Sequence, residues 1–356
     1  MHILFTLKDF KPGGGVERVQ QRLAGQFLKD GRRVSFFVMN GETPGVEGAH
    51  ALDGGGNGIL GWLKSIVLLR RIIRREGVTH LIGAKEQANL CTWFATLGSR
   101  CRVIYTRHTA LDCSEQKTGA SSLRLLYALY LCGSDKVVTV SYGLHQSLAG
   151  LMPWGRKRVC YCPNAVVSEQ LHKASREPMP ANVPVEYWIG VGRLVQLKGF
   201  HLMLDAYATV LAERTVPDLV IVGDGPERSA LVEQAQRLGI GDRVHFTGLL
   251  DNPYPLIRHA RLLILSSLHE GMPTVLIEAM ALGTPVLASE CAAGLGQLLD
   301  HGRLGQLVQV NDVPALAQGM RNSLDVHAPC PRGALQAMRE FTSEHAASTY
   351  YKVWDQ

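Results

Sequence analysis

Three consecutive glycines, Gly13, Gly14 and Gly15, stand between a first apolar run and a helix-like segment. Glycine lets the backbone approach a ligand closely, and the start of the following helix presents free N–H groups. Such a loop favours a phosphate or a carboxylate. The pattern is neither G-x-G-x-x-G nor that of a P-loop, which weakens a dinucleotide or P-loop assignment. A loop that binds nothing explains these residues alone equally well.

Two basic residues, Arg193 and Lys198, follow an apolar run in the second half and are flanked by Gly192 and Gly199. Arginine offers a planar fork of donors and lysine a point charge, so the two can converge on one diphosphate. Basic residues on a loop are more often simply solvated, and the pair alone favours that simpler interpretation.

Two carboxylates, Glu270 and Glu278, flank a predicted turn into a helix, which Gly271 and Pro273 mark. The free N–H groups at the start of that helix suit an anion such as a diphosphate. Ionised carboxylates accept several O–H donors, so the two glutamates could bind hydroxyl groups at different parts of one extended ligand, such as a sugar. The alternative is a capping and surface role for both.

Alternating apolar and amphipathic segments provide the elements that position these residues. In the first half the expected strands are Ile3–Leu7, Val34–Met39, His80–Gly83, Val103–Arg107 and Lys136–Val140. The expected helices are Val16–Lys29, Leu60–Arg75, Gln87–Leu97, Ser121–Leu131 and Tyr142–Leu151. Uninterrupted β-branched runs indicate strands buried on both faces of a parallel sheet. The alternation therefore predicts a doubly wound α/β sheet with right-handed crossovers.

The pattern stops near residues 163–186, where Pro178, Pro180 and Pro184 predict an extended linker. The second series has expected strands Tyr187–Val191, Asp218–Val222, Val244–Thr247, Leu262–Ser266 and Pro285–Ala288. Its expected helices are Gly199–Arg214, Glu227–Leu238, Tyr254–Ala260 and Val275–Leu282. The final segment, Arg332–Trp354, is expected to be helical and to pack back across the hinge. The predicted domains are 1–165 and 187–335, joined by the linker 166–186 and followed by a C-terminal helix over 336–356.

The composition supports two buried cores. The chain has 356 residues, of which 46% are hydrophobic and 19% charged, which excludes intrinsic disorder. A net charge of +6 suits anionic substrates or an anionic membrane surface and does not by itself indicate nucleic acid. No apolar run reaches the roughly 18 residues of a membrane-spanning helix, and the N-terminal residues do not follow the pattern of a secretory signal. The eight cysteines include no C-x-x-C pair, which predicts a cytoplasmic protein with reduced thiols.

Taken together and in order, the motifs resemble those of the family 4 glycosyltransferases of the GT-B fold. The matching segments are 13–15, 191–194 with 198–199, 222–226, 246–248, and 266–273 running into 278–286. The resemblance covers nearly the whole chain and is strongest over residues 187–310. It implies two Rossmann-like domains that face each other across a cleft. It also implies transfer of a sugar from a nucleotide sugar with retention of anomeric configuration.

The resemblance further implies which residues bind the donor. Arg193 and Lys198 are expected to neutralise the diphosphate, Glu270 to hold hydroxyl groups of the donor sugar, and Glu278 to hold the ribose. The other donor-binding positions are expected to be Gly13, Gly14, Gly15, Gly192, Gly248, Leu250, Gly271, Met272, Pro273, Thr274 and Val275. The base pocket is expected near 247–250, with a UDP-sugar favoured over GDP-mannose as donor.

The residues implied in catalysis are Arg193, Lys198, Glu270 and His108, a histidine that in the family contacts the donor sugar near its anomeric carbon. Without the family pattern, a histidine after a buried strand is more often a structural residue. Stabilisation of the leaving diphosphate should be the main catalytic effect. The sequence has no Asp-x-Asp pair and no evident nucleophile, so we expect no metal and no cofactor. Lys85, Glu86 and Arg107 are candidate acceptor-binding residues at the carboxyl ends of expected strands.

The segment Leu60–Arg75 combines basic and apolar residues with Trp62, which is typical of a helix at a membrane surface. It fits a helix that merely covers the sheet equally well. We therefore expect a cytoplasmic enzyme at the inner face of the cytoplasmic membrane. It would move a hexose or N-acetylhexosamine onto a glycan or glycolipid acceptor of lipopolysaccharide or capsule. The alternatives are a GDP-mannose-dependent mannosyltransferase and a non-catalytic nucleotide-sugar- or glycan-binding module.

Overall fold

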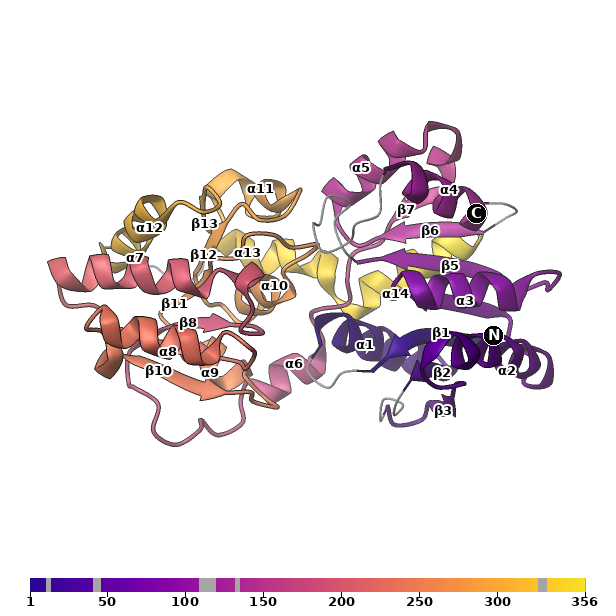
Figure 1. The fold of residues 1–356 in the computed structure, drawn as a ribbon, viewed down its shortest axis with the longest axis horizontal. Coiled ribbons are helices and arrows are strands. Elements are labelled where there is room, and N and C mark those ends of the chain that lie inside the picture. The colour runs from indigo at the N-terminus through magenta and orange to yellow at the C-terminus, as the bar shows by residue number, and fades with distance from the viewer. Residues whose placement is uncertain (11–13, 41–45, 109–119, 132–134, 326–331, 356) are drawn as a thin grey trace. The chain divides into compact units, whose positions relative to one another are not determined.

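The computed structural model describes residues 1–10, 14–40, 46–108, 120–131, 135–325 and 332–355. These residues form two compact units, one of Met1–Val166 with Glu340–Gln356 and one of Val167–Arg339. Each unit contains one sheet in which all neighbouring strands run parallel, and helices cover both of its faces (Figure 1). Two Rossmann-like units of this kind confirm the predicted fold class.

The first unit is built on a seven-stranded sheet in the order β3-β2-β1-β4-β5-β6-β7. Its strands are β1 (His2–Asp9), β2 (Arg33–Asn40), β3 (His50–Asp53), β4 (His80–Ala84), β5 (Arg102–Arg107), β6 (Lys136–Thr139) and β7 (Val159–Tyr161). Its helices are α1 (Gly15–Lys29), α2 (Gly58–Arg75), α3 (Glu86–Thr96), α4 (Ala120–Tyr130), α5 (Tyr142–Leu151) and α14 (Ser343–Asp355).

Alternate side chains of β1 enter two different cores. Ile3 and Phe5 pack in the core that includes residues of α1 and α14, whereas Leu4 packs in the core that includes residues of α2 and α3. Successive side chains of a strand point to opposite faces, so a sheet covered on both faces needs apolar residues at every position. This explains the uninterrupted apolar runs in the sequence.

The C-terminal helix α14 completes the first unit. The ring of Phe27 in α1 lies 5.4 Å from that of Tyr351 and 5.8 Å from that of Trp354, measured between centroids. The chain therefore begins and ends in the same core.

The final segment, 332–354, is helical as expected, but it is divided into three parts. The structure has a short helix α13 (Arg332–Ala337), a 3-10 turn (Met338–Phe341) and then α14. The Oγ1 of Thr342 accepts the N–H of His345 at 3.3 Å, so Thr342 caps the start of a new helix. The predicted boundary at 335/336 accordingly differs from the observed one, which follows Arg339.

The second unit has a six-stranded sheet in the order β10-β9-β8-β11-β12-β13. Its strands are β8 (Tyr187–Val191), β9 (Asp218–Val222), β10 (Val244–Gly248), β11 (Leu262–Leu265), β12 (Val286–Ser289) and β13 (Gln306–Val308). Its helices are α6 (Glu169–Ala174), α7 (Phe200–Glu213), α8 (Arg228–Arg237), α9 (Tyr254–His259), α10 (Thr274–Ala281), α11 (Leu295–Leu298), α12 (Val313–Asp325) and α13.

The segment 166–186 is not the extended linker that its prolines predict. Ser168 caps α6 by accepting the Leu171 N–H at 3.2 Å, so a helix forms before the first proline. The side chain of Asn252 donates to the Ala174 carbonyl at 2.9 Å and to Glu177 at 2.8 Å. These contacts make the segment part of the second unit.

Candidate functional site

The loops that follow β8 and β9 lie against each other in the second unit. The Leu194 N–H donates to the Asp224 carbonyl at 2.9 Å. Gly223 has a φ of 140°, and a Cβ atom at this position would lie 1.9 Å from the carbonyl oxygen of Gly192. Because only glycine fits there, Gly192 and Gly223 together fix the loop that carries Arg193.

A second set of contacts joins the loop after β8 to the loop after β11. Gly199 has a φ of 61°, and a Cβ atom there would lie 2.1 Å from the carbonyl oxygen of Ser266. The Ser266 hydroxyl donates to the Lys198 carbonyl at 3.2 Å, and the Leu268 N–H donates to the Leu197 carbonyl at 2.8 Å. Lys198 is therefore held by backbone contacts beside the loop that contains Glu270.

Lys198 and Glu270 form an ion pair, in which both side chains are partly buried. Glu270 also accepts the Ser267 hydroxyl at 2.9 Å, and its N–H donates to the Cys291 carbonyl at 2.7 Å. Arg193, by contrast, is exposed, and its side chain has no hydrogen bond or ion pair with any residue that the structure describes. This edge of the sheet thus offers one exposed cation and one cation already paired with a carboxylate.

Glu278 lies in the second half of α10, and its side chain is 4% exposed. Its Oε1 accepts the Tyr254 hydroxyl at 3.0 Å. The loop residues Gly271 and Met272 and the first residues of α10, Thr274 and Val275, are partly exposed, whereas Pro273 is buried. The first turn of α10 carries no acidic side chain, so its free N–H groups suit an anion.

The expected base pocket begins at the end of β10. Gly248 has a φ of 75° and forms an antiparallel bridge with Gly223, whose N–H donates to the Gly248 carbonyl at 2.9 Å. Leu250 follows and is partly buried. Gly248 therefore lies beside the glycine-dependent loop after β9, which in turn contacts the loop of Arg193.

The first unit has its own cluster of charges at the carboxyl ends of β1 and β4. Lys85 has a φ of 73°, a conformation that few residues other than glycine adopt. Its Nζ lies 2.7 Å from an oxygen of Glu17 and 3.7 Å from one of Asp9. Glu17 is 3% exposed and lies in the first turn of α1, so the lysine compensates a carboxylate that is shielded from water.

A second ion pair joins Glu86, the first residue of α3, to Arg107 at the end of β5. Arg107 is 1% exposed, and Tyr130 donates its hydroxyl to the Glu86 carbonyl at 3.2 Å. Arg107 is thus part of the interior of the unit. Of the three candidate acceptor residues, only Lys85 and Glu86 retain side-chain surface in this unit.

His108 follows β5 directly. Its Nε2 lies 3.0 Å from Oγ1 of Thr106 and 3.4 Å from Nε2 of Gln20. Because the Thr106 hydroxyl donates to the Gly83 carbonyl at 2.7 Å, we assign the proton of the ring to Nε2, which leaves Nδ1 as an acceptor. Desolvation, with smaller effects of the nearby charges of Lys85 and Arg107, lowers the pKa of His108 from 6.5 to about 3. The ring is neutral at physiological pH.

The glycine loop is only partly described, since Gly13 lies outside the described residues. Gly14 has extended backbone and is the N-cap of α1, and its carbonyl accepts the Arg18 N–H at 3.0 Å. Gly15 is the first residue of the helix. The N–H groups of the first turn of α1 therefore begin where the sequence predicts them.

Two family models match the chain, one on each side of the boundary between the units. "Glycosyltransferase Family 4" matches residues 13–170, and "Glycosyl transferases group 1" matches residues 186–325. The chain belongs to the family 4 glycosyltransferases of the GT-B fold. The predicted family is thereby confirmed.

Individual relatives of this chain are also glycosyltransferases by name. An uncharacterized glycosyltransferase of Haemophilus influenzae is 25% identical over 323 residues, which cover 89% of this chain and 88% of the relative. A lipopolysaccharide core biosynthesis glycosyltransferase, LpsE of Rhizobium meliloti, is 30% identical over 179 residues, 49% of this chain and 50% of LpsE. The chain spans about half the length of this and several other curated relatives. A crystal structure of Anabaena HepE in complex with UDP shares the fold with a TM-score of 0.77, 20% identity and 99% coverage of both chains.

Some residues of the candidate site were not predicted from the sequence. Tyr254 is the clearest case, because it lies 24 positions before Glu278 in a short apolar helix, where a tyrosine resembles an ordinary core residue. Ser267, which donates to Glu270, lies inside a recognised motif but carries no signal of its own. The left-handed conformation of Lys85 has no sequence signal either, since glycine is the residue expected there.

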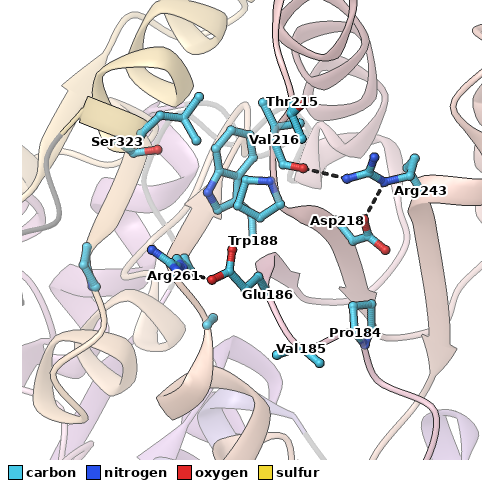
Figure 2. Close-up of a pocket in the computed structure, with 14 residues that line it drawn as sticks. Pro184, Val185, Glu186, Trp188, Thr215, Val216, Asp218, Arg243, Arg261 and Ser323 are labelled. Atoms are coloured by element: carbon cyan, nitrogen blue, oxygen red, sulfur yellow. Dashed lines mark hydrogen bonds and ion pairs between the residues drawn. The ribbon is translucent and has the colours of Figure 1, made fainter.

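The second unit also contains a cavity that lies away from this site. It has a volume of about 820 Å³ and lies at the opposite, amino-terminal edge of the sheet (Figure 2). Its arginines are paired: Arg243 contacts Asp218 at 2.5 Å and the Val216 carbonyl at 2.6 Å, and Arg261 pairs with Glu186. None of the predicted donor residues lines it. Across the described ranges, no group of three or more His, Cys, Asp and Glu side chains could hold a metal ion.

Proposed function

We propose that this glycosyltransferase moves a hexose or N-acetylhexosamine from a UDP-sugar to a lipid-linked or polysaccharide acceptor during the synthesis of a cell-surface glycan. The observation that carries the proposal is the Lys198–Glu270 ion pair beside the exposed Arg193 and the loop leading into α10. The names of two relatives support donor and acceptor class, since HepE was crystallised with UDP and LpsE is assigned to lipopolysaccharide core biosynthesis.

In the proposed donor complex the diphosphate takes the place of a carboxylate at Lys198. The lysine then contacts the phosphate oxygens together with Arg193, and the N–H groups of the first turn of α10 bind the same charge. Glu270, released from Lys198, accepts hydroxyl groups of the donor sugar. Glu278, oriented by the Tyr254 hydroxyl, accepts those of the ribose.

The proposed chemistry is stabilisation of the leaving nucleoside diphosphate. As the glycosidic bond breaks, negative charge grows on the β-phosphate, next to two cations and a helix N-terminus. The β-phosphate accepts the proton of the incoming hydroxyl group, and the new bond forms on the face that the leaving group vacates. The configuration of the anomeric carbon is therefore retained, and the protein contributes neither a nucleophile nor a metal.

The proposed residues of the first unit are Lys85 and Glu86 on the acceptor side and the neutral His108 beside the donor sugar. Lys85 and Glu86 present charge at the carboxyl ends of β1 and β4, where ligands of open α/β sheets bind. His108 supplies an unprotonated Nδ1, an acceptor for a hydroxyl group. Arg107 contributes indirectly, because its ion pair fixes the start of α3 and thereby Glu86.

The proposal includes a peripheral contact with an anionic membrane surface through α2. Leu69 and Ile73 of this helix pack on the sheet, but Ile59 and Leu60 are 80% and 83% exposed. The exposed apolar residues of α2, of α3 and of the C-cap of α3 are Ile59, Leu60, Leu63, Val67, Phe94 and Leu97. Basic residues of α2 flank them, as in helices that lie at an interface. Of the helices in the described ranges, none combines the length and the hydropathy of a membrane-spanning segment.

Cosedimentation with vesicles tests the membrane contact. The variant Leu60→Ser/Leu63→Ser should lose at least half of its binding to vesicles that contain phosphatidylglycerol. The control Leu249→Ser/Leu335→Ser removes two exposed leucines of the second unit and should bind as the original protein does. Equal binding by both variants would remove the membrane contact from the proposal and leave the transferase reaction untouched.

The reaction is tested by incubating the protein with UDP-sugars and GDP-mannose, with and without EDTA, and by measuring nucleoside diphosphate release and the anomeric configuration of the product. Glu270→Gln should lower kcat by about 100-fold, the scale of lost transition-state stabilisation, while UDP binds at least as well because Lys198 is freed. Glu278→Gln should mainly raise KM for the donor. A control, Lys173→Ala, removes an exposed lysine of α6 and should change neither constant.

Several results would contradict the proposal. Binding of UDP without turnover for any acceptor would favour a non-catalytic module, and turnover of GDP-mannose alone would favour a mannosyltransferase. Loss of activity in EDTA that Mn²⁺ restores would contradict the role given to Arg193 and Lys198. An inverted product would exclude the proposed attack on the leaving-group face.

A further inference from the structure

Two adjoining cavities lie at the amino-terminal edge of the sheet in the first unit, the edge away from Lys85 and His108. The larger one has a volume of about 660 Å³ and is lined by Arg32, Arg102 and the aromatic residues Tyr351 and Trp354 of α14. The smaller one, of about 310 Å³, lies between the ends of α2 and α3. Thr79 and Arg100 line both, so the two cavities adjoin, and together we call them the depression.

The depression is strongly basic. Five arginines line it (Arg32, Arg70, Arg74, Arg100 and Arg102), against a single carboxylate, Asp355. Arg102 donates to the Trp354 carbonyl at 2.6 Å and lies 3.7 Å from Asp355, and Arg32 lies over the ring of Tyr351 at 5.4 Å. The other three have no side-chain hydrogen bond or ion pair with residues in the described ranges.

His80 lines the larger cavity, and its pKa is affected by the positive charge there. Burial, and next the charge of Arg102, lower its pKa from 6.5 to about 4, so this ring adds no charge at neutral pH. Its ring packs edge-on against Trp354, with centroids 4.8 Å apart. The larger cavity is thus lined by aromatic rings as well as by guanidinium groups.

The cavity of Figure 2 can be compared with this depression, because it lies at the same edge of the sheet in the second unit. There too the cavity lies where parallel strands begin, and two arginines line it, but each is paired with a carboxylate. A cavity at this edge therefore does not require unpaired arginines. Like charges that gather without partners repel one another, and an anion that binds among them relieves this repulsion.

We propose that this basic depression of the first unit binds a phosphate-bearing polyanion. Guanidinium groups match phosphate oxygens in pairs, and the three unpaired arginines all line the smaller cavity, with Arg100 lining the larger one as well. The same chemistry is offered by the headgroup of an anionic lipid and by a soluble phosphorylated ligand. The site is separate from the proposed donor diphosphate, which binds in the second unit.

The test measures binding of tripolyphosphate by calorimetry with the whole protein saturated with UDP, so that the donor site is filled. The variant Arg74→Gln/Arg100→Gln should bind at least tenfold more weakly than the original protein. The control Arg156→Gln/Lys157→Gln removes the same charge from exposed residues of the first unit that lie outside both the depression and α2, and should bind within twofold. Melting temperatures of both variants verify that each is folded.

A second measurement distinguishes the two sources of phosphate. Cosedimentation is compared for vesicles of phosphatidylcholine with and without 30% phosphatidylglycerol. If binding to the anionic vesicles falls more in the depression variant than in the control, the ligand is a lipid headgroup. Weaker tripolyphosphate binding with equal vesicle binding identifies a soluble ligand. Equal behaviour of the two variants in both measurements, or no binding by the original protein in either, would overturn the proposal.

Discussion

The carboxyl edges of the two sheets are built by different means. In the second unit, backbone contacts that only glycine allows, at Gly199 and Gly223, join neighbouring loops and leave Arg193 exposed. In the first unit, side-chain ion pairs do this work, and they bury Arg107 and Glu17. A backbone framework can position a cation such as Arg193 without pairing it, whereas an ion-pair framework neutralises the charges that it positions. The second unit is accordingly better suited to bind a dianion.

The largest expected effect tests the ion-pair framework. Arg107→Met leaves Glu86 without its cation in a largely buried place, so the first unit should lose about 3 kcal/mol of unfolding free energy. Chemical denaturation, followed by circular dichroism, measures the loss. The double variant Arg107→Met/Glu86→Leu should recover part of it, because no unpaired charge remains. Additive losses in the double variant would mean that the pair does not hold this edge together.

The next effect tests the backbone framework. Gly199→Ala forces a left-handed residue and a Cβ atom 2.1 Å from the Ser266 carbonyl oxygen, so a loop must move. We expect a loss of about 2 kcal/mol or more in the second unit and weaker UDP binding, because Lys198 shifts with the loop. The control is Gly283→Ala, at a φ of 83° with no atom within 4 Å of the added Cβ. Equal losses in the two variants would show that conformation, not the contact between loops, sets the requirement for glycine.

The difference between the two edges also explains how much of the candidate site could be predicted from the sequence. The glycine-dependent edge was predictable, because glycines and flanking charges are visible as motifs in one dimension. The ion-pair edge was not, since Glu17 and Lys85 are 68 positions apart and nothing in the sequence marks them as partners.

Elements of the fold were likewise predicted where the sequence carries a local pattern. Buried strands such as 3–7 and 187–191 were predicted nearly to the residue, because both faces of each are apolar. The edge strands β3 and β13 were not predicted, since none of their residues is buried and they carry no apolar run. Helix α6 was concealed by the prolines that follow it, although its N-cap serine is a recognisable signal.

The smallest expected effect concerns His108, which lies among the charges of the first unit. Its pKa is about 3 in the folded protein, below its ordinary value of 6.5, because burial and then the charges of Lys85 and Arg107 disfavour the protonated ring. Between these two values the unfolded chain binds more protons than the folded one, so this histidine favours folding fully above pH 6.5 and progressively less as pH falls. Unfolding free energies measured between pH 4 and 7 should therefore depend on pH less steeply in His108→Gln than in the original protein. The difference in slope should correspond to at most one proton bound on unfolding. His2, His80 and His145 also have lowered pKa values, but they are present in both proteins and cancel in the comparison. Identical slopes would mean that the pKa of His108 is the same in the folded and unfolded protein, and below pH 6.5 the first unit would then present a cation at its carboxyl edge, as the second unit does at Arg193.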